Sequence, residues 1–471
     1  MSATMRCRAP RALGLVAAAV LAGCTSLAPS YEQPPLPVAE RFPDPGTPAP
    51  AGALLATDIA WQNYFTDPRL KELITLALRY NRDLRVAALN IEVARAQWQI
   101  QRSDQVPGVN LGAIGNRETN ASGGITSSYV AGLSVPQFEL DFFGRVANLS
   151  DAARGQYLAT EEARKTTQIV LIAAVANTYL TLLGEVEQLV LTQQTLATRE
   201  DSRRLTQLKF DNGVASALDL AQADTLVEGA RVSLQVLKRQ RAQSANALVQ
   251  LVGRPVTLDM PAGSTLVGMT IGPELPAGLP SGLLTSRPDI RQAEQQLRAA
   301  NANIGAARAA FFPRITLTGS AGAASGTLTD LFKSGGLAWS FTPQIVLPIF
   351  DGGFNQANLE VATAQREITI AQYDKTVQTA FREVADALAG RATLTEQLKA
   401  QFAQAQAEQA RFALADLRYQ SGISSYLDVL DAQRSLFVAQ LSTVQVKVSQ
   451  LQNQVTLYKV LGGGWTDPPA Q

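Results

Sequence analysis

The chain has 471 residues, with 41 Lys and Arg against 40 Asp and Glu, two cysteines and no histidine. A formal net charge of +1 argues against a nucleic-acid partner, which would need a basic face. Without histidine, the usual zinc and blue-copper sites and the Ser-His or Cys-His nucleophile pairs cannot be built. Carboxylate-only or lysine chemistry stays open, but no recognisable catalytic set is present. We therefore expect neither an enzyme nor a bound metal or cofactor.

The N-terminus predicts an export signal. Arg6, Arg8 and Arg11 precede a short apolar run, residues 12–22, and small residues lead from it to Cys24. The run has about 11 residues, whereas a permanent membrane helix takes about 20. We therefore expect residues 1–23 to be a signal peptide that is removed. The mature chain then keeps a single cysteine, so no disulfide can stabilise its fold.

Residues 21–24, Leu-Ala-Gly-Cys, resemble the bacterial lipobox, which implies that Cys24 carries a covalent lipid. Two or more acyl chains anchor a protein stably. Thr25 stands where inner-membrane retention would call for Asp, which favours the outer membrane. The alternative is an ordinary signal peptide in which Cys24 is incidental. Residues 24–68 are predicted to form a lipidated N-terminal tether, extended in its proline-rich part.

The rest of the chain contains one pattern twice. Residues 81–85 match residues 287–291 at a spacing of 206, and residues 210–219 match residues 419–428 at a spacing of 209. Such internal similarity is the signature of a structural repeat. The predicted organisation is repeat 1 over residues 69–253, a linker with equatorial character over residues 254–280, repeat 2 over residues 281–462, and a C-terminal tail over residues 463–471.

Each repeat is expected to begin with a helix and a β-hairpin. In repeat 1, apolar residues at helical spacing predict a helix over residues 70–103, which Pro107 ends. Alternation then predicts strands over residues 109–113 and 129–138, with a loop between them over residues 116–127. The corresponding prediction for repeat 2 is a helix to residue 312, strands over residues 315–318 and 338–347, and a loop over residues 325–336.

Two long helices and two shorter ones should follow the hairpins. Residues 148–210 and 355–419 contain no proline and are rich in Ala, Gln, Glu, Leu and Arg. A helix of 63 residues is about 95 Å long. Gly213 and Gly422 mark turns, since glycine readily adopts the left-handed conformation at a helix end. Returning helices then run to Gly253 and Gly462.

These lengths predict a membrane channel made from several copies of the chain. After the signal, no stretch reaches 18 apolar residues, so a membrane can be crossed only by β-strands. Four strands of about ten residues have the length of tilted transmembrane strands but cannot close a barrel. Three copies would supply twelve. The Ala-rich, narrowly apolar helices would then form a hollow cylinder, so the predicted fold class is a mixed membrane β-barrel plus a long α-helical barrel. The alternative is a coiled-coil scaffold with two hairpins.

Four further motifs carry a family resemblance. They lie at residues 306–313, 350–353, 430–437 and 461–465, and together with the lipobox they resemble the OprM branch of the TolC-like outer-membrane efflux proteins. The resemblance covers nearly the whole chain in order. It implies a homotrimer with one twelve-stranded barrel and a periplasmic helical tunnel. It also implies a periplasmic adaptor and an inner-membrane pump of the resistance-nodulation-division type as partners in exporting drugs, detergents and dyes.

Two acids are candidates for the tunnel tip. Asp219 and Asp428 each follow a serine by three residues, which is the spacing of a helix-capping pair. Asp431 lies one turn beyond Asp428, so both carboxylates can share a face. In a trimer they would form two acidic rings that bind cations and raise one another's pKa. The resemblance places acids at both positions in the family's constriction. Capping for Asp428, and a solvated surface position for Asp431, are the alternatives.

Arg418, Tyr419 and Leu427 complete the predicted gate. The family's matching positions tie neighbouring helices together in the closed state, and the position of Leu427 narrows the pore. We expect Arg418 and Tyr419 to hold the tip closed until the adaptor and pump release them. The alternative is that Arg418 is a solvated charge and Tyr419 a packing residue. Because Asp431 corresponds to Gln222 and Tyr419 to Phe210, the gate is predicted to belong mainly to repeat 2.

A passive exit duct in a multidrug efflux system accounts for the repeats, strands, long helices and lipobox together. The chain has no Gly-rich phosphate loop of the GxxxxGK type, so the energy for transport must come from a partner. Alternatives are an outer-membrane conduit for type I protein secretion and a lipid-anchored coiled-coil scaffold. The scaffold would leave the hairpins without a purpose.

Overall fold

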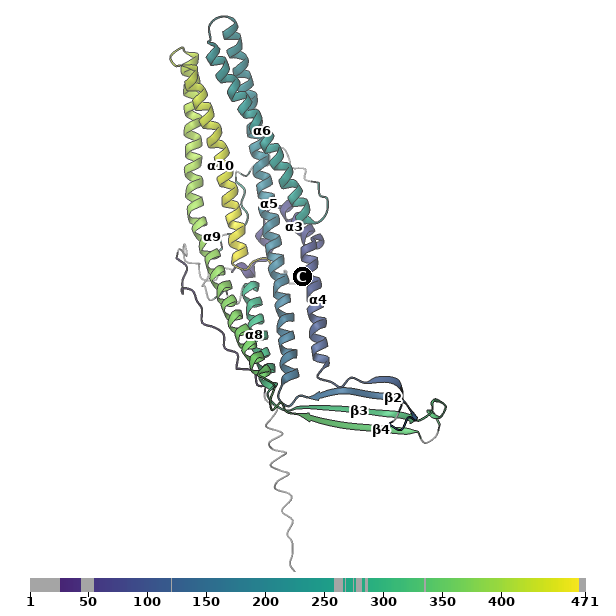
Figure 1. The fold of residues 1–471 in the computed structure, drawn as a ribbon. Helices are drawn as coiled ribbons and strands as arrows, with labels where there is room; N and C mark the ends of the chain where they lie inside the picture. The colour runs from purple at the N-terminus through teal and green to yellow at the C-terminus, as the bar shows by residue number, and fades with distance from the viewer. Residues whose placement is uncertain are drawn as a thin grey trace, which may run out of the picture. The chain divides into compact units, whose positions relative to one another are not determined.

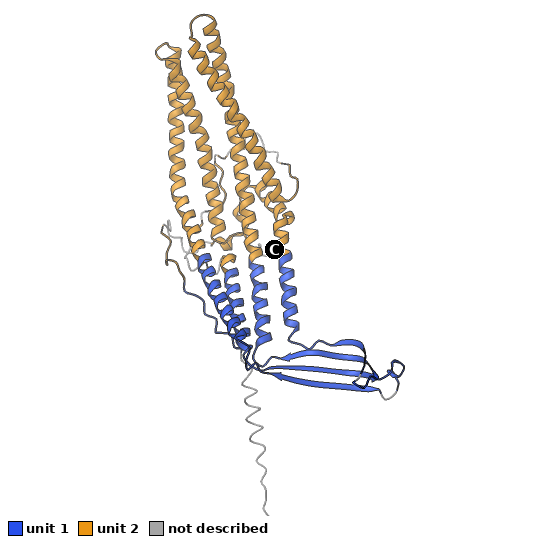
Figure 2. Cartoon of the chain, viewed as in Figure 1, with its two compact units in different colours: residues 1–35, 89–162, 291–376 blue, residues 36–88, 163–290, 377–471 orange. Residues whose placement is uncertain are grey.

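The computed structural model describes residues 26–43, 55–119, 121–257, 266, 268–273, 275–276, 282–283, 287–333 and 336–465. The predicted signal peptide and Cys24 lie outside these residues, as do most of the predicted linker and most of the C-terminal tail. The chain divides into two compact units (Figure 2). Unit 1 contains residues 1–35, 89–162 and 291–376, and unit 2 contains residues 36–88, 163–290 and 377–471. Each unit therefore draws on both predicted repeats.

Helices and strands follow in the same order twice (Figure 1). Two short elements, η1 (Ala56–Asp58) and α2 (Trp61–Tyr64), come first. The first copy then comprises α3 (Pro68–Tyr80), α4 (Arg82–Ser103), β1 (Asn110–Thr119), β2 (Ile125–Leu140), α5 (Arg145–Asp211) and α6 (Ala217–Val252). The second comprises α8 (Pro288–Ala309), β3 (Arg314–Ser325), η3 (Leu328–Asp330), β4 (Leu337–Val346), α9 (Phe354–Gln420) and α10 (Tyr426–Val460).

The helix predicted over residues 70–103 is interrupted at Asn81. The backbone N–H of Asn81 donates to the Ala77 carbonyl at 2.8 Å, which ends α3. Its side chain accepts from the Leu84 N–H at 2.9 Å, which begins α4 as an asparagine N-cap does. The same side chain donates to the Leu251 carbonyl at 2.9 Å, at the end of α6. One residue thus satisfies three helix ends, two of them through its side-chain amide.

Arg287 occupies the corresponding position of the second copy. Its Nη1 donates to the Val460 carbonyl at 3.0 Å, the counterpart of the Leu251 carbonyl. Arg287 is buried, and its charge is matched by Asp289 at 2.6 Å and Glu383 at 2.9 Å. In the first repeat, the Asn81 amide therefore joins the end of α6 to the start of α4. In the second, the ion-paired Arg287 joins the end of α10 to the start of α8.

The strands form one antiparallel sheet in the order β1-β2-β3-β4, and β2 and β3 join the two hairpins. Three strands, β1 to β3, are longer than predicted, whereas β4 has the predicted length. In the first hairpin, residues 116–119 of the predicted loop pair with residues 125–128 and so satisfy their backbone groups. In the second, β3 extends through Ser325, the first residue of the predicted loop. Between Val135 and Phe138 the pairing of β2 with β3 shifts by one residue, which is a β-bulge.

The helices α5 and α9 have 67 residues each, close to the predicted lengths. Within unit 2 both pack against α10 through a glycine. A Cβ added at Gly184 of α5 would lie 2.5 Å from Cγ2 of Val448, and one added at Gly390 of α9 would collide with Asn453. Among the described residues, α5 alone has a window long and apolar enough to cross a membrane, but 61% of that window is buried inside the protein.

Unit 2 has an aromatic core that includes part of the predicted tether. Tyr64 stacks on Tyr458 with ring centroids 3.9 Å apart. The Tyr458 hydroxyl donates to the Ile59 carbonyl at 2.6 Å, and the Tyr64 hydroxyl donates to the Gln454 carbonyl at 3.0 Å. Phe65 is fully buried beside both rings. Residues 59–65 therefore belong to the folded body.

Candidate functional site

The predicted gate residues lie where the two helical hairpins of unit 2 turn. The hairpins α5–α6 and α9–α10 have their turns at the same end of that unit (Figure 2). Gly213 has φ +75° and its N–H donates to the Phe210 carbonyl at 2.9 Å. Gly422 has φ +73° and its N–H donates to the Tyr419 carbonyl at 3.0 Å. A positive φ favours glycine, so both turns depend on this residue type.

The two returning helices begin differently. Ser216 and Asp219 form a capping box: the serine hydroxyl accepts from the Asp219 N–H at 3.1 Å, and the Asp219 carboxylate accepts from the Ser216 N–H at 3.0 Å. The bond from the Ser216 backbone N–H lowers the pKa of Asp219. Ser425, by contrast, makes no side-chain cap. Within the described part of the chain, the Asp428 carboxylate is exposed and has neither a hydrogen bond nor an ion pair, so Asp428 does not cap α10 in the single chain.

Tyr419 joins the two hairpins. Lys209 Nζ, one turn before the end of α5, donates to the Tyr419 hydroxyl at 2.8 Å. The same ammonium group lies 4.4 Å from the centroid of the Tyr419 ring. The centroid of the Tyr419 ring lies 5.1 Å from the centroid of the Tyr426 ring. The predicted role of Tyr419 in tying helices together thus has a partner within the same chain, and that partner comes from the first copy.

Asp431 is held by two arginines. Its carboxylate accepts a short hydrogen bond from Arg411 of α9 and pairs with Arg434 of α10 at 2.6 Å. The bond from Arg411 is the main cause of a lowered pKa for Asp431. The predicted raising of this pKa by neighbouring acids applies to a trimer. In the single chain the pKa of Asp431 is lowered, because two arginines lie beside its carboxylate.

The remaining predicted gate residues face solvent in the single chain. Arg418 is exposed and, in the described part of the chain, its guanidinium has no hydrogen bond or ion pair. Leu427 is 56% exposed, and Ile423 next to the turn is 68% exposed. The first hairpin repeats this pattern, with Val214 at 76% and Leu218 at 65%. Each tip therefore presents two apolar side chains that the single chain does not cover.

A small pocket connects the two hairpins behind the tip. It has a volume of about 190 Å³ and lies between α6 and α10. Asp431 and its first-copy counterpart Gln222 both line it, as do Leu226, Leu430 and Arg434. Equivalent positions of the two repeats thus line one pocket, and only the second repeat supplies charged side chains to it.

Sequence reasoning missed the cations that hold these residues. Arg434 follows Asp431 by three residues on one helix, a spacing that places side chains side by side and could have been recognised. Arg411 precedes Gly422 by 11 residues while Asp431 follows it by nine, which is the pattern of partners across a helical hairpin. Lys209 had no such signal, because its contact with Tyr419 depends on how two distant hairpins pack.

The sheet of unit 1 has two chemically different faces. One row across all four strands is Leu111, Leu133, Ala321 and Trp339, and the adjacent row is Asn110, Ser134, Ser320 and Ser340. Neighbouring rows point to opposite faces because side chains alternate along a strand. Leu111 is 81% exposed and Trp339 is 75% exposed, whereas Ser320 and Ser340 join their hydroxyls at 2.7 Å.

The bulge in β2 preserves this division. Val135 pairs with Gly319 and Phe138 pairs with Leu317, so both β2 residues share the apolar face although they are three residues apart. Without the extra residue, Glu139 would point to that face. Instead Glu139 pairs with Thr316 and is held by Arg145 and Arg314, each at 2.6 Å.

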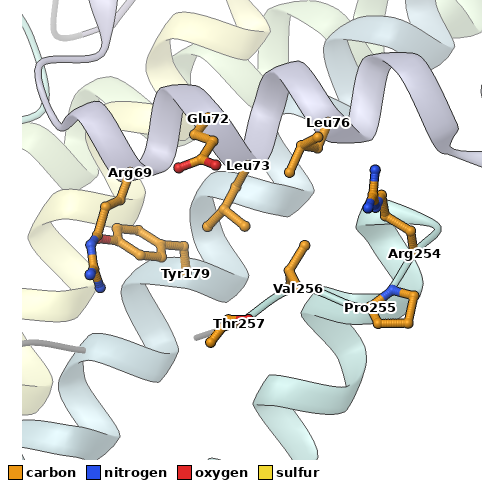
Figure 3. Close-up of a pocket in the computed structure, with 9 residues that line it drawn as sticks. All are labelled: Arg69, Glu72, Leu73, Leu76, Tyr179, Arg254, Pro255, Val256 and Thr257. Carbon is orange, nitrogen blue, oxygen red and sulfur yellow. The ribbon is translucent and has the colours of Figure 1, made fainter. Parts of the chain in front are cut away.

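A larger pocket lies in unit 2, away from the tip, with a volume of about 460 Å³ (Figure 3). Arg69 and Glu72 of α3 line one side, and residues 254–257 line the other. Tyr179 of α5 also lines it, and its hydroxyl donates to Asp67 at 2.8 Å. The lining offers no nucleophile paired with a base. Over the residues that the structure describes, no group of three or more acids or cysteines could hold a metal ion.

A family model described as outer membrane efflux protein matches residues 73–254 and 279–463. The chain belongs to the outer membrane efflux protein family. It is 47% identical over 465 residues to the probable efflux pump outer membrane protein TtgC of Pseudomonas putida, covering 97% of this chain and 96% of that protein. It is 44% identical over 456 residues to outer membrane protein OprJ of Pseudomonas aeruginosa, with 95% of each chain covered.

Solved members of the family have the same fold. The open state of the Neisseria gonorrhoeae MtrE outer membrane channel aligns with a TM-score of 0.87 and 42% identity, over 94% of this chain and 99% of that one. CusC, described as forming a transmembrane channel, aligns with a TM-score of 0.85 and 38% identity. The predictions of the family and of an outer-membrane efflux channel are therefore confirmed, and the fold is that of TolC-like channels. The family is one of transporters rather than enzymes.

Proposed function

We propose that three copies of this chain form one outer-membrane duct, through which drugs and other small molecules leave the cell passively. The four strands of each copy contribute to a twelve-stranded barrel, and the helices form a tunnel in the periplasm. A periplasmic adaptor and an inner-membrane pump of the resistance-nodulation-division type supply the substrates and the energy. The relatives named as outer membrane proteins of efflux pumps support these partners.

The two-faced sheet carries the proposal. Its outer strands β1 and β4 each have one unpaired edge, and every residue of both strands is exposed in the single chain. An open sheet is not viable in lipid, because unpaired backbone groups are costly there, whereas a closed barrel pairs them all. Apolar side chains on one face and hydroxyl or amide side chains on the other are the pattern of a barrel with lipid outside and water inside.

Exposed helix stripes favour a homotrimer. On α4, Leu89, Val93 and Ile100 lie on one face and are each about half exposed or more. On α9, Phe354, Val361 and Ile368 repeat at intervals of seven residues and are also exposed. Residues at this spacing form an apolar seam that packs against a neighbouring helix. A second copy of the chain would cover both seams and, at the same time, pair the open strand edges.

The lipid on Cys24 and the gate remain part of the proposal. Acylation of Cys24 anchors the chain in the outer membrane, in addition to the barrel. At the periplasmic tip of each chain, the Lys209–Tyr419 contact joins the two hairpins and the Arg411–Asp431 contact joins the two helices of the second hairpin, and together they hold a closed arrangement. Arg418, Leu427 and Asp428, which have no partner in the described part of the single chain, then face the neighbouring copies around the pore.

Matched arginine substitutions on the two faces of β4 test the barrel. Phe341→Arg places a cation on the apolar face, which at the bilayer midplane costs about 2–4 kcal/mol per copy. We expect it to deplete detergent-resistant, heat-modifiable trimers from the outer membrane. Ser340→Arg, on the neighbouring residue of the polar face, should assemble normally and shift the single-channel current toward anions. Equal assembly of the two variants, or equal loss of both, would contradict the proposed orientation of the sheet.

A further inference from the structure

Within unit 2, the hairpins α5–α6 and α9–α10 contact each other through α5 and α10. A Cβ added at Gly184 of α5 would lie 3.8 Å from Cβ of Val448 of α10. Nearer the turns, the guanidinium carbon of Arg199 lies 5.0 Å from the centroid of the Phe437 ring. All four residues are buried. We call this contact of α5 with α10 the internal seam.

Two glutamines bond across the internal seam, and both recur at equivalent places. Gln188 of α5 donates to a carbonyl of α10 at 3.5 Å, and Gln452 of α10 donates to a carbonyl of α5 at 3.1 Å. At the spacing of 209 that relates the hairpins, their counterparts are Gln397 of α9 and Gln243 of α6, and both are exposed. These helices thus present two faces equivalent to the sides of the internal seam. We call them the outer faces: residues 393, 397 and 408 of α9 and residues 228, 239 and 243 of α6.

The tip repeats this correspondence with the same chemistry. Within the chain, Lys209 lies 4.4 Å from the centroid of the Tyr419 ring. Their counterparts are Arg418 and Phe210, again a cation and an aromatic ring, and both are exposed. A second copy of the chain offers each outer face its complement, because the two hairpins are repeats of one another. A head-to-tail contact of this kind generates a ring when the rotation closes.

The centre of the internal seam has no chemical equivalent on the outer faces. Arg199 is 5% exposed, its Nη1 donates to the Leu226 carbonyl at 3.0 Å, and burial lowers its pKa. In the described part of the chain this guanidinium has no carboxylate partner. Its counterpart on α9 is Glu408, and the counterpart of Phe437 on α6 is Glu228. A buried cation on a ring thus closes the internal seam, whereas the outer faces carry acids at the same positions.

Both acids have an arginine one turn away on their own helix. Glu408 pairs with Arg411 at 3.2 Å, and Glu228 pairs with Arg231 at 2.7 Å. The helices of the internal seam run antiparallel, and the same orientation of α9 and α6 sets the two acids side by side. Arg411 then lies at one end of the acidic pair and Arg231 at the other. Such a network contributes more than isolated surface ion pairs do.

The charge of the two outer faces is also complementary. Residues 229–252 of α6 contain no acid and four cations, which are Arg231, Lys238, Arg239 and Arg241. In the described part of the chain, Arg239 is exposed and has no ion pair. Its place opposite Thr393 lies between Asp386 and Glu396 of α9, which share a face with Thr393. Complementary charge favours the contact of α9 with α6 over a contact of either helix with itself.

We propose that α9 of one copy of the chain packs against α6 of the next along an outer seam that repeats the internal seam but is held by ion pairs. These join Glu408 and Arg411 of one copy with Glu228 and Arg231 of the next. The inference rests on the proposed homotrimer and assigns contacts between its copies. Because salt screens exposed ion pairs, ionic strength loosens the outer seam and leaves the internal seam unchanged.

Two cysteine pairs at equivalent positions test the outer seam. The internal pair is Gly184→Cys with Val448→Cys, and its Cβ separation of 3.8 Å suits a disulfide. The outer pair is Thr393→Cys with Arg239→Cys. On mild oxidation of membranes, the internal pair should close within one chain and leave the mass on a denaturing gel unchanged. The outer pair should give covalent dimers and trimers, whereas Thr393→Cys alone and Arg239→Cys alone should give neither.

The salt dependence of cross-linking tests the ion pairs. Between 0.1 and 1 M salt the screening length falls from about 10 Å to about 3 Å. We expect cross-linking of the outer pair to slow severalfold over this range, and that of the internal pair to stay constant. Adding Glu408→Gln and Arg231→Gln to the outer pair should slow the reaction at low salt and remove its salt dependence. Adding Asp201→Asn and Arg204→Gln, which neutralises an ion pair of α5 outside both seams, should change neither.

Light scattering of the purified protein measures the trimer independently. A trimer whose outer pair does not cross-link refutes the outer seam but not the proposed duct. Outer cross-linking that is insensitive both to salt and to the Glu408→Gln, Arg231→Gln substitutions overturns the ionic contact. A monomer in the membrane-extracted parent protein would instead refute the proposed duct itself.

Discussion

At the scale of single residues, the tip is held by cations that contact an aromatic ring and a carboxylate. Lys209 binds Tyr419 through both its hydroxyl and its ring face, and Arg411 binds Asp431 across the second hairpin. Both contacts are partly solvent-exposed, so each contributes only modestly to stability. Weak contacts suit the proposed gate, because the proposed partner proteins would have to break them.

Removing the Tyr419 hydroxyl should loosen the tip. Tyr419→Phe keeps the ring but deletes the hydroxyl that accepts from Lys209. The loss of this hydrogen bond destabilises the closed tip by about 1 kcal/mol, which shifts the closed–open balance of each chain roughly fivefold. We expect a larger mean single-channel conductance in planar bilayers. Phe210→Tyr, the reciprocal change at the first-copy position, adds a hydroxyl and serves as the control. An unchanged conductance in Tyr419→Phe would exclude this contact from the gate.

The Arg411–Asp431 pair predicts a pH dependence. The bond from Arg411 lowers the pKa of Asp431. The pair therefore stabilises the folded tip at pH values above about 4, the ordinary pKa of an Asp side chain. This stabilisation is lost as the pH falls through the lowered pKa of Asp431. In Arg411→Met the pKa of Asp431 should rise toward its ordinary value. The midpoint at which cation selectivity is lost on acidification should therefore move to higher pH.

Arg382→Met is the control for that measurement, since Arg382 pairs with Asp386 at 3.1 Å on the same helix but outside the tip. Selectivity midpoints that coincide in Arg411→Met and the parent protein would mean that Asp431 does not carry the selectivity.

At the scale of elements, close helix packing and strand register define the two units. The helices α5 and α9 approach α10 at Gly184 and Gly390, where a side chain would collide. In the sheet, one extra residue in β2 keeps Leu133, Val135 and Phe138 on one face. Both features affect many residues. A helix moves as a rigid element, and a register slip of one residue turns every side chain of a strand to the opposite face of the sheet.

Gly184→Ala should destabilise unit 2. The added Cβ would lie 2.5 Å from Cγ2 of Val448, and overpacking of this kind costs about 1–3 kcal/mol. Chemical denaturation followed by helical circular dichroism measures the loss. Val448→Ala in the same chain should restore part of it. Gly229→Ala on α6, where nothing lies within 4 Å, should instead stabilise by about 0.5–1 kcal/mol. Equal effects at both glycines would argue against the α5–α10 contact.

At the scale of the whole molecule, the single chain exposes surfaces that an assembly of several chains would cover. The open strand edges, the apolar sheet face and the apolar stripes of α4 and α9 are all exposed. A second copy and a lipid bilayer together account for them. The proposed lipid on Cys24 would add a membrane contact that does not depend on closure of the barrel.

Ile100→Asp should weaken the proposed trimer. Ile100 is 62% exposed in the single chain and lies on the apolar stripe of α4, so burial against another copy would desolvate the new carboxylate without a partner. Light scattering of the purified protein should report more monomer. Gln99→Asp introduces the same charge on a different face of α4 and should leave the mass unchanged. A trimer that survives both substitutions equally would place the interface elsewhere.

Much of the molecule could be derived from local patterns. The two repeats, the order of helices and hairpins, the two long helices and the turns at Gly213 and Gly422 followed from periodicity and from the conformational preferences of proline and glycine. These signals lie within a few residues of the element that they define. The family followed in the same way, because its motifs are contiguous stretches of sequence.

What only the tertiary structure decided involves residues far apart in the chain. The register between the hairpins and the contact of Lys209 with Tyr419 link segments separated by more than 170 residues, whose proximity depends on packing. The gate shows the difference most clearly. Their spacing predicts only that Asp428 and Asp431 can share a face. In the described chain Asp431 is paired with Arg411 while the Asp428 carboxylate has no partner, because only one of them reaches a cation across the hairpin.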